Sequence, residues 1–305
     1  MHKETGEVVK LATVTVFTPT YNRAELLKRG YAALKRQTCK DFLWLIIDDG
    51  STDNTRNVVE QWQQAEKEFE IQYVHKENGG LHTGYNTAIA LLETELAMCV
   101  DSDDFLPDNA VEKIVNFWRE NGSADVAGII ALDGTANYQV VGDPLPDVQH
   151  INLIDLLIGK YKIVNGDRKL VVRSELYKEV APQRTFSGEK NFNPHYMHLQ
   201  ISKKYDFLVL NEIMCVVEYQ AEGMSNGIYC QYYNSPKSFA ETRRLYLSFE
   251  NVGIAFRFRQ CVHYVSSCIL AGEKDFLATS PAKALTLMAT PLGYALSLYI
   301  RCKAR

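Results

Sequence analysis

Residues 98–104 read Met-Cys-Val-Asp-Ser-Asp-Asp, a short apolar run that ends abruptly in three carboxylates. The apolar part predicts a buried strand, and the acidic part predicts the loop that follows it. Clustered carboxylates repel one another and raise one another's pKa values unless a cation lies between them. Asp101 and Asp103, at i and i+2, can be aimed at one ion by a bend in the chain. The stretch therefore predicts a site for Mg²⁺ or Mn²⁺, which take oxygen ligands and keep positions open for phosphate oxygens.

A solvated acidic turn, with Asp108 capping the next helix, is the alternative interpretation, and a second acidic loop favours the metal site over it. Residues 43–51 read Leu-Trp-Leu-Ile-Ile-Asp-Asp-Gly-Ser, which predicts a strand buried on both faces and then an acidic glycine turn. A third apolar run, residues 14–17, is followed by Thr-Pro-Thr-Tyr-Asn-Arg at residues 18–23. Ligands bind outside the carboxyl ends of the strands in open parallel sheets, so we expect these loops to form one site.

Composition limits the size of the core, the class of partner and the cellular compartment that we expect. A chain of 305 residues with 46% hydrophobic residues can bury a sizeable core. Its formal net charge of -4 argues against a nucleic-acid binder that relies on a broad basic surface. Seven cysteines without a CxxC pair favour a reducing compartment and no zinc site. The polar N-terminus lacks the apolar core of a signal peptide, so we expect a cytoplasmic protein.

Strand and helix patterns alternate over about residues 11–135. Repeated strand–helix units with short connections predict an α/β fold, a mainly parallel sheet with helices on both faces. The later part of the chain is less regular. There the patterns predict helices at 151–161 and 193–204, and strands at 170–173, 208–210 and 214–217.

Four segments together resemble a known family. They are residues 18–23, residues 48–53 (Asp-Asp-Gly-Ser-Thr-Asp), residues 78–80 (Asn-Gly-Gly) and residues 101–104 (Asp-Ser-Asp-Asp). Their order and spacing resemble those of inverting glycosyltransferases of family 2, which have the GT-A fold. The resemblance is strong over the first 135 residues and looser to about residue 225. It implies a Rossmann-like sheet, a nucleotide-sugar donor, a divalent cation and transfer to a hydroxyl acceptor.

The resemblance also implies a division of the chain. Residues 1–135 would form the nucleotide-sugar-binding half of the GT-A domain, and residues 136–228 the acceptor-binding half. Residues 229–305 would form a helical C-terminal extension.

The resemblance implies a role for each motif residue. Tyr21 would pack on the nucleobase, and Asp49 would accept from a base N–H, which favours uracil and hence a UDP-sugar. Asp103 would ligate the metal directly and Asp101 would lie near the metal or the ribose, so that the metal neutralises the departing diphosphate. The implied nucleotide-sugar site is Pro19, Thr20, Tyr21, Arg23, Asp49, Asn78, Gly79, His82, Asp101 and Ser102.

Residues 78–82 form a glycine turn before a helix, and such a turn lets backbone N–H groups approach phosphate. Many relatives carry Lys or Arg near this turn, and His82 stands there in this sequence. His82 is therefore either a phosphate contact or a neutral, hydrogen-bonded structural residue.

An inverting transfer needs a general base opposite the leaving group. The resemblance places it in residues 186–190, Phe-Ser-Gly-Glu-Lys, where Glu-Lys replaces the usual acidic pair and Glu189 is the first candidate. Asp167 is the second candidate, and a helix-start carboxylate without a catalytic role is a third interpretation. His195 and His198, at i and i+3, either line the acceptor cleft or simply pack. Glu218 together with residues 223–225 resembles a closing loop over the donor site.

Residues 284–300 are almost uncharged and are bounded by Lys283 and by basic residues at 301, 303 and 305. One interpretation is a helical hairpin packed on the domain. The other is an interfacial helix that makes a peripheral contact with the inner face of the cytoplasmic membrane through residues 284–305, which would suit a lipid-linked acceptor.

The resemblance implies an enzyme of cell-surface polysaccharide synthesis, acting on a glycan or lipid-linked acceptor. The processive-synthase Gln-x-x-Arg-Trp signature is absent, so we expect one sugar to be added per encounter. Two alternatives remain from the residues alone. A nucleotidyltransferase also pairs acidic loops with a metal, although its Gly-rich phosphate loop is missing here. A catalytically silent sugar-nucleotide-binding protein would keep the nucleobase loops and lose the base.

Overall fold

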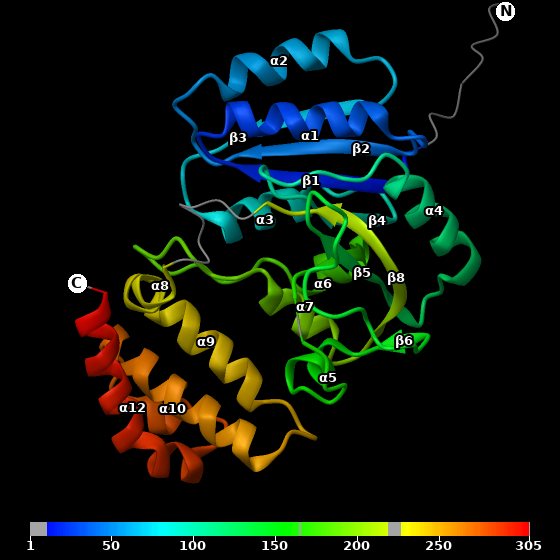
Figure 1. Ribbon diagram of the computed structural model, residues 1–305. Coiled ribbons are helices and arrows are strands. Elements are labelled where there is room, and N and C mark those ends of the chain that lie inside the picture. The colour runs from blue at the N-terminus through cyan, green and yellow to red at the C-terminus, as the bar shows by residue number, and fades with distance from the viewer. Residues whose placement is uncertain (1–10, 165, 219–226, 305) are drawn as a thin grey trace, which may run out of the picture.

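The computed structural model describes residues 11–164, 166–218 and 227–304 of the chain, and one eight-stranded sheet runs through most of them (Figure 1). The strand order is β3-β2-β1-β4-β7-β5-β8-β6. The strands are β1 Val14–Thr20, β2 Phe42–Asp48, β3 Glu70–His75, β4 Leu96–Cys99, β5 Val126–Gly134, β6 His150–Ile151, β7 Arg168–Arg173 and β8 Asp206–Val216.

Helices cover both faces of this sheet, and a separate group of helices follows it at the C-terminal end (Figure 1). Those around the sheet are α1 Ala24–Arg36, α2 Thr55–Ala65, α3 Leu81–Ala90, α4 Ala110–Asn121, α5 Leu153–Leu157, α6 Ser174–Val180 and α7 His195–Ile201. The C-terminal group contains α8 Ile228–Asn234, α9 Pro236–Leu247, α10 Ile254–Ala271, α11 Phe276–Thr279 and α12 Lys283–Lys303.

Strand direction explains which chain segments reach the functional edge of the sheet. β3, β2, β1 and β4 are parallel, β7 is antiparallel to both β4 and β5, and β5 pairs parallel with β8. The mainly parallel α/β sheet predicted from the sequence is therefore confirmed. Because β7 runs backwards, its first residues lie at the same edge as the carboxyl ends of β1, β2, β4, β5 and β8.

The apolar runs form strands because their residues fill both faces of the sheet. Every residue of β1, β2 and β5 is buried. Alternation in β2 sends Trp44 and Ile46 into one hydrophobic core and Leu45 and Ile47 into the other. Sheet strands buried on two sides hold their register firmly, and this rigid platform carries the loops of the site.

The second part of the sheet differs from the prediction. The strands expected at 208–210 and 214–217 are one strand, β8, with register shifts against β5. The polar residues between the two apolar runs do not break it, because Asn211 exchanges side-chain hydrogen bonds with the backbone of Leu145. The helix expected over 151–161 is shortened to α5, and Gly159 follows it with a φ of 77°.

In the C-terminal group, α12 packs along α10. Pro291 lies inside α12 without ending it, and Gly293 lets the two helices approach closely, since a Cβ at that position would lie 2.5 Å from Val265 Cβ. The predicted helical extension is confirmed. Among the helices that the structure describes, none has the length and apolar character needed to cross a bilayer.

Candidate active site

A cleft of about 930 Å³ opens at the carboxyl edge of the sheet. Its walls come from the ends of β1, β2, β4, β5 and β8, from the start of β7, and from α5, α7 and α8. Nine of the thirteen residues that the sequence assigns to the donor, the metal and the base line it: Pro19, Thr20, Tyr21, Arg23, Asp49, Asp101, Ser102, Asp103 and Asp167. The three loops that follow β1, β2 and β4 are thus brought together in one cavity.

Asn22 locks the first loop to the second. Its backbone N–H donates to Ser51 Oγ at 2.8 Å, and its side-chain oxygen accepts from the Thr52 N–H at 2.7 Å. Asn22 has a φ of 52°, a left-handed conformation that asparagine tolerates better than most residues. Tyr21 is consequently held beside the cleft with 48% of its surface exposed, so a planar ring can stack on it.

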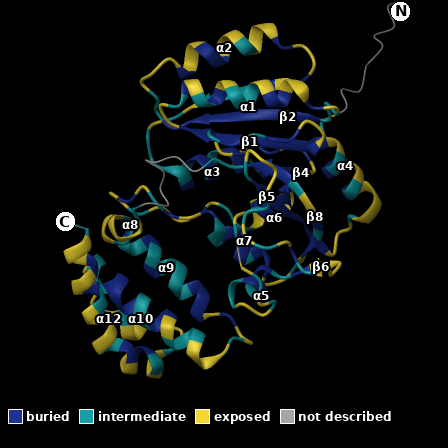
Figure 2. Ribbon diagram, in the orientation of Figure 1, coloured by how far each residue is buried: buried dark blue, intermediate teal, exposed yellow. Residues whose placement is uncertain are grey.

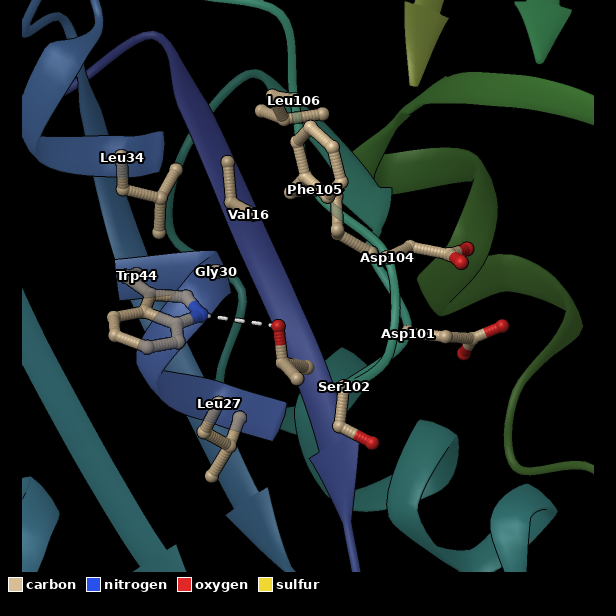
Figure 3. Close-up of a pocket in the computed structure, with 12 residues that line it drawn as sticks. Val16, Leu27, Gly30, Leu34, Trp44, Asp101, Ser102, Asp104, Phe105 and Leu106 are labelled. Atoms are coloured by element: carbon tan, nitrogen blue, oxygen red, sulfur yellow. Dashed lines mark hydrogen bonds between the residues drawn. The ribbon is translucent and has the colours of Figure 1, made fainter. Parts of the chain in front are cut away.

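The acidic loop after β4 is anchored from behind by apolar packing. Figure 3 shows Phe105 and Leu106 against the β1 and α1 side, and it shows Asp101 and Asp104 projecting away from that packing. The loop closes with a hydrogen bond from the Asp104 N–H to the Asp101 carbonyl at 2.9 Å. The apolar anchor fixes the backbone, and the carboxylates are left facing the cleft.

Negative charge accumulates in this loop. Burial raises the pKa of Asp104 to about 7; Lys169 opposes that rise, and Asp101 and Asp103 add to it. Arg23 is the nearest cation to Asp103, with Nη1 3.0 Å from Asp103 Oδ1, and the same Nη1 donates to Ser102 Oγ at 3.2 Å.

The donor set suits a hard cation. Asp101 and Asp103 offer carboxylate oxygens to the cleft, and Asp104 adds a third carboxylate beside them. Within the described ranges, no group of three or more His, Cys, Asp or Glu residues is arranged to hold a metal ion. Magnesium and manganese in nucleotide sites are commonly held by one or two carboxylates plus substrate phosphates, and these residues fit that kind of site.

Asp49 organises the glycine turn beside the cleft. Its carboxylate accepts from the N–H groups of Gly79 at 3.0 Å and Gly80 at 2.7 Å, and Lys76 also contacts it. The Asn78 side chain donates to the Asp49 carbonyl at 2.7 Å. Asp49 itself lines the cleft, whereas Asn78 and Gly79 are not among the lining residues. Both residues hydrogen-bond to Asp49, and their predicted contact with the donor stays a prediction.

His82 also differs from one of its two expected roles. It is 1% exposed, and it is not among the cleft-lining residues. Burial lowers its pKa, so the ring is neutral near neutral pH. Of the two interpretations, the structure supports the structural residue and not the phosphate contact.

Glu189 does not point into the cleft as its turn suggested. Its two carboxylate oxygens accept from the N–H groups of Lys237 and Ser238 at 2.8 Å, and from Ser238 Oγ at 2.7 Å. These groups open α9, whose first N–H groups have no partner within the helix. The expected orientation of Glu189 is corrected: the side chain holds the beginning of a helix, where a negative charge is favourable.

Two buried charged residues at the cleft were missed by the sequence analysis. Asp133 is the last residue but one of β5 and is 3% exposed, and its Oδ1 has no hydrogen-bond partner in the described part of the chain. Lys169, at the start of β7, is 8% exposed and donates to the Cys99 carbonyl at 3.1 Å. Burial raises the pKa of Asp133 to about 6, and Lys169 opposes the rise. Only the reversed direction of β7 brings Lys169 to this edge.

A further part of the cleft lining is more apolar. Leu153, Leu156 and Leu157 come from α5, and His195 and His198 come from α7. The two histidines thus line the cleft, as one of their interpretations had it. His198 Nε2 and the Tyr177 hydroxyl form a hydrogen bond of 2.7 Å.

Asp167 and Glu218 occupy the rim. Asp167 is exposed and precedes β7. Glu218 forms a bidentate pair with Arg29, both distances being 2.7 Å. The rest of the closing loop expected here, residues 223–225, lies outside the described residues.

Residues 15–175, more than half of the chain, match the family model described as Glycosyl transferase family 2. The chain belongs to this family. Among curated relatives, the poly(ribitol-phosphate) beta-N-acetylglucosaminyltransferase TarP of Staphylococcus aureus (strain N315) is 32% identical over 125 residues, which is 40% of this chain and 37% of TarP. A chondroitin synthase of Escherichia coli is 28% identical over 118 residues, 39% of this chain and 17% of that enzyme. The chain thus spans well under two thirds of either relative.

Solved structures share the fold of this family 2 member. TarS residues 1–349 from S. aureus, in complex with UDP-GlcNAc, has a TM-score of 0.56 at 16% identity, covering 94% of this chain and 92% of that one. The mannosyltransferase PcManGT from Pyrobaculum calidifontis, in complex with GDP-Man and Mn²⁺, has a TM-score of 0.57 at 18% identity, covering 97% and 84%. The GT-A fold implied by the sequence motifs is confirmed.

Proposed function

We propose that this family 2 member is an inverting glycosyltransferase that moves a sugar from a UDP-sugar to a hydroxyl group. The observation that carries the proposal is the shared cleft of the acidic loop, Asp101 and Asp103, and the exposed ring of Tyr21. A nucleobase can stack on the Tyr21 ring, and a cation held by the two carboxylates can compensate the charge of a diphosphate. Both requirements are met in one cavity at the carboxyl edge of the sheet.

The donor would lie across the three loops. Tyr21 stacks on the base, and Thr20, whose buried Oγ1 has no partner in the described chain, offers a hydroxyl beside it. Asp49 keeps acceptor capacity for an imide N–H, because a carboxylate has about four lone-pair positions and three donors contact it here. An imide N–H is a feature of uracil, which supports UDP.

Asp103 and Asp101 would hold the divalent cation together with the diphosphate. A bound Mg²⁺ or Mn²⁺ supplies positive charge to the leaving diphosphate. Arg23, paired with Asp103 at 3.0 Å, is placed to add a further positive charge at the same position.

We assign the general base to Asp167, because the carboxylate of Glu189 is taken up by α9. Asp167 lines the cleft at the start of β7 and is exposed to an incoming acceptor. It would take the proton of the acceptor hydroxyl while that oxygen bonds to the anomeric carbon. The bond from this carbon to the diphosphate oxygen breaks on the opposite face, and the electron pair leaves with UDP. Attack from the face opposite the leaving group inverts the configuration.

The acceptor would enter along the apolar wall of α5 and α7. A glycan or lipid-linked acceptor fits leucine side chains and uncharged rings better than a free anion would. A role in cell-surface polysaccharide synthesis on the cytoplasmic side of the membrane, with one sugar added per encounter, is the setting that we propose.

Release of UDP from a panel of UDP-, GDP- and dTDP-sugars, with simple sugars as acceptors and with Mn²⁺ present, tests this function. We expect release from a UDP-sugar above all others. Asp167→Asn should lower the rate by about 10²–10⁴-fold with UDP affinity kept, because the base touches the acceptor and not the nucleotide. Asp147→Asn, at an exposed position outside the cleft lining, is the matched control.

Other results of these measurements would contradict the proposed function or one of its assignments. Preferred release from a GDP-sugar would contradict the uracil assignment. Binding of UDP with no release from any donor would indicate a silent sugar-nucleotide-binding protein, and release of pyrophosphate a nucleotidyltransferase. An unchanged rate in Asp167→Asn would return the base to Glu189.

A further inference from the structure

Helix α12 exposes a long apolar face. Its outward positions recur at helical spacing, and six large side chains there are between 45% and 69% exposed: Leu287, Met288, Leu292, Tyr294, Leu298 and Tyr299. Figure 2 shows α12 at the outside of the helical group, with its outward positions coloured as exposed. From Leu287 to Tyr299 no exposed position is charged. We call these six residues the α12 face.

The packing of α12 differs from that of an ordinary surface helix. Apart from Ile300 at its C-terminal end, the residues that are buried against its neighbours have small side chains: Thr286, Ala289, Gly293 and Ser297. A surface helix of a water-soluble domain usually turns its large apolar residues inward. Small residues between helices, with large apolar residues outside, are typical of helices that touch lipid.

The α12 face continues onto α8 and reaches the cleft. Tyr299 meets Tyr229 edge to face, with ring centroids 5.5 Å apart. On the same helix Ile228 and Tyr233 are 42% and 44% exposed. Ile228 and Gln231 also line the active-site cleft. The apolar surface therefore extends from α12 to the rim of the catalytic cavity.

The charged residues of α12 are all basic. Residues 276–305 contain no Asp or Glu, and Lys283, Arg301 and Lys303 are exposed at the two ends of α12. An anionic lipid surface attracts such residues, whereas it repels acidic ones. Tyrosines in the apolar stripe suit the boundary between headgroups and acyl chains.

A second copy of the chain would cover this face less well. Two α12 helices packed antiparallel would place Lys283 of one beside Arg301 and Lys303 of the other, and a parallel pair would also align like charges. No acidic residue within α12 could offset this repulsion. Anionic lipid supplies the missing negative charge and apolar contact together.

We propose that the α12 face docks on an anionic bilayer surface, with α12 lying in the interface and the cleft rim at α8 held beside the membrane. The membrane contact follows from α12 and α8 alone. That it delivers a lipid-linked acceptor to the cleft rests on the proposed function.

Flotation of the 305-residue chain with vesicles tests the docking. We expect binding to vesicles of phosphatidylcholine mixed with phosphatidylglycerol, little binding to phosphatidylcholine alone, and release by high salt. Arg301→Gln with Lys303→Gln should lower the partition coefficient by about thirtyfold, from about 1 kcal/mol for each basic residue. Leu287→Glu with Leu298→Glu should lower it by about a hundredfold. Leu91→Glu with Val148→Glu changes two exposed apolar residues elsewhere and should leave binding unchanged.

The controls separate this proposal from the proposed function. UDP titration should give wild-type affinity in the α12 variants, and Asp103→Ala should bind vesicles as the wild type does. Absence of vesicle binding by the wild type, or equal binding by Leu287→Glu with Leu298→Glu, would overturn the docking. A dimer in sedimentation velocity that the same double variant dissociates, without vesicle binding, would assign the α12 face to a second copy and overturn it as well.

Discussion

At the scale of single residues, the charge balance of the cleft depends on Lys169. Burial alone would lower its pKa, yet Cys215, Asp133, Asp104 and Asp101 around it raise that pKa well above its ordinary value. A buried cation held this way stays charged near neutral pH. It offsets the carboxylates that gather where β4, β5 and β7 meet.

Lys169→Met tests that role. The substitution keeps the length of the side chain and removes its charge, which leaves buried carboxylates uncompensated and should lower the free energy of unfolding by roughly 3 kcal/mol. Urea denaturation measures this, with Lys178→Met at an exposed position as control. Adding Asp133→Asn should restore part of the loss, since the two side chains interact. Equal stability of Lys169→Met and the wild type would refute the role.

His198 gives the site a predicted response to acid. Burial, and then nearby His195, lower the pKa of His198 to about 3. The unfolded chain has a histidine pKa near 6.5, so it binds a proton first as the pH falls, and stability present above pH 6.5 is lost toward pH 3. Between pH 7.5 and pH 5 this amounts to roughly 2 kcal/mol of unfolding free energy.

His198→Gln should remove this part of the acid dependence, because glutamine can still bond to the Tyr177 hydroxyl and does not titrate. The part that comes from His195, whose pKa burial lowers to about 4, should remain. Chemical denaturation at the two pH values measures it. The control His75→Gln changes an exposed histidine and should keep the wild-type dependence. The same loss of stability in His198→Gln as in the wild type would contradict the assignment.

At the scale of elements, the first turn of α9 donates hydrogen bonds to the carboxylate of Glu189, which belongs to a distant segment of the chain. Glu189 accepts three hydrogen bonds there, and a glutamine can accept on only one side-chain oxygen. Glu189→Gln should therefore lower the free energy of unfolding by about 1.5–3 kcal/mol and leave UDP affinity unchanged. Thermal unfolding and UDP titration of the same sample check both parts. A large loss of turnover at wild-type stability would instead make Glu189 the base.

The elements also show which parts of the fold and the site can be predicted from the sequence. Apolar runs before acidic turns are local signals, and they predict β1, β2, β4 and the loops that face the cleft. Asp133 and Lys169 carry no such signal, because they belong to the site only through the insertion of β7, reversed, between β4 and β5. The orientation of Glu189 could not be predicted for a related reason: a Gly-Glu turn fixes where the carboxylate starts, and the packing of α9 fixes which groups it bonds to.

At the scale of the whole molecule, the sheet, the cleft and the helical group form a continuous arrangement. The sheet edge presents the loops that we propose to bind the donor, α5 and α7 form the proposed acceptor wall, and α8 connects the cleft to the α12 face. Family membership follows from local motifs that the fold brings together. The proposed acceptor wall could not be derived in this way, since its residues come from α5 and α7, whose positions depend on packing between distant segments.

The central claim is a UDP site that depends on a divalent cation and on Asp103. Calorimetric titration of UDP into the wild type, with Mn²⁺ and then with chelator, tests it directly, alongside Asp103→Ala and the exposed control Asp125→Ala. We expect Mn²⁺ to strengthen UDP binding by at least about tenfold in the wild type and in the control, and not in Asp103→Ala, since removing a ligand costs at least as much metal affinity as removing its support. Equal UDP affinity with and without Mn²⁺ in the wild type, or full Mn²⁺ dependence in Asp103→Ala, would contradict the account.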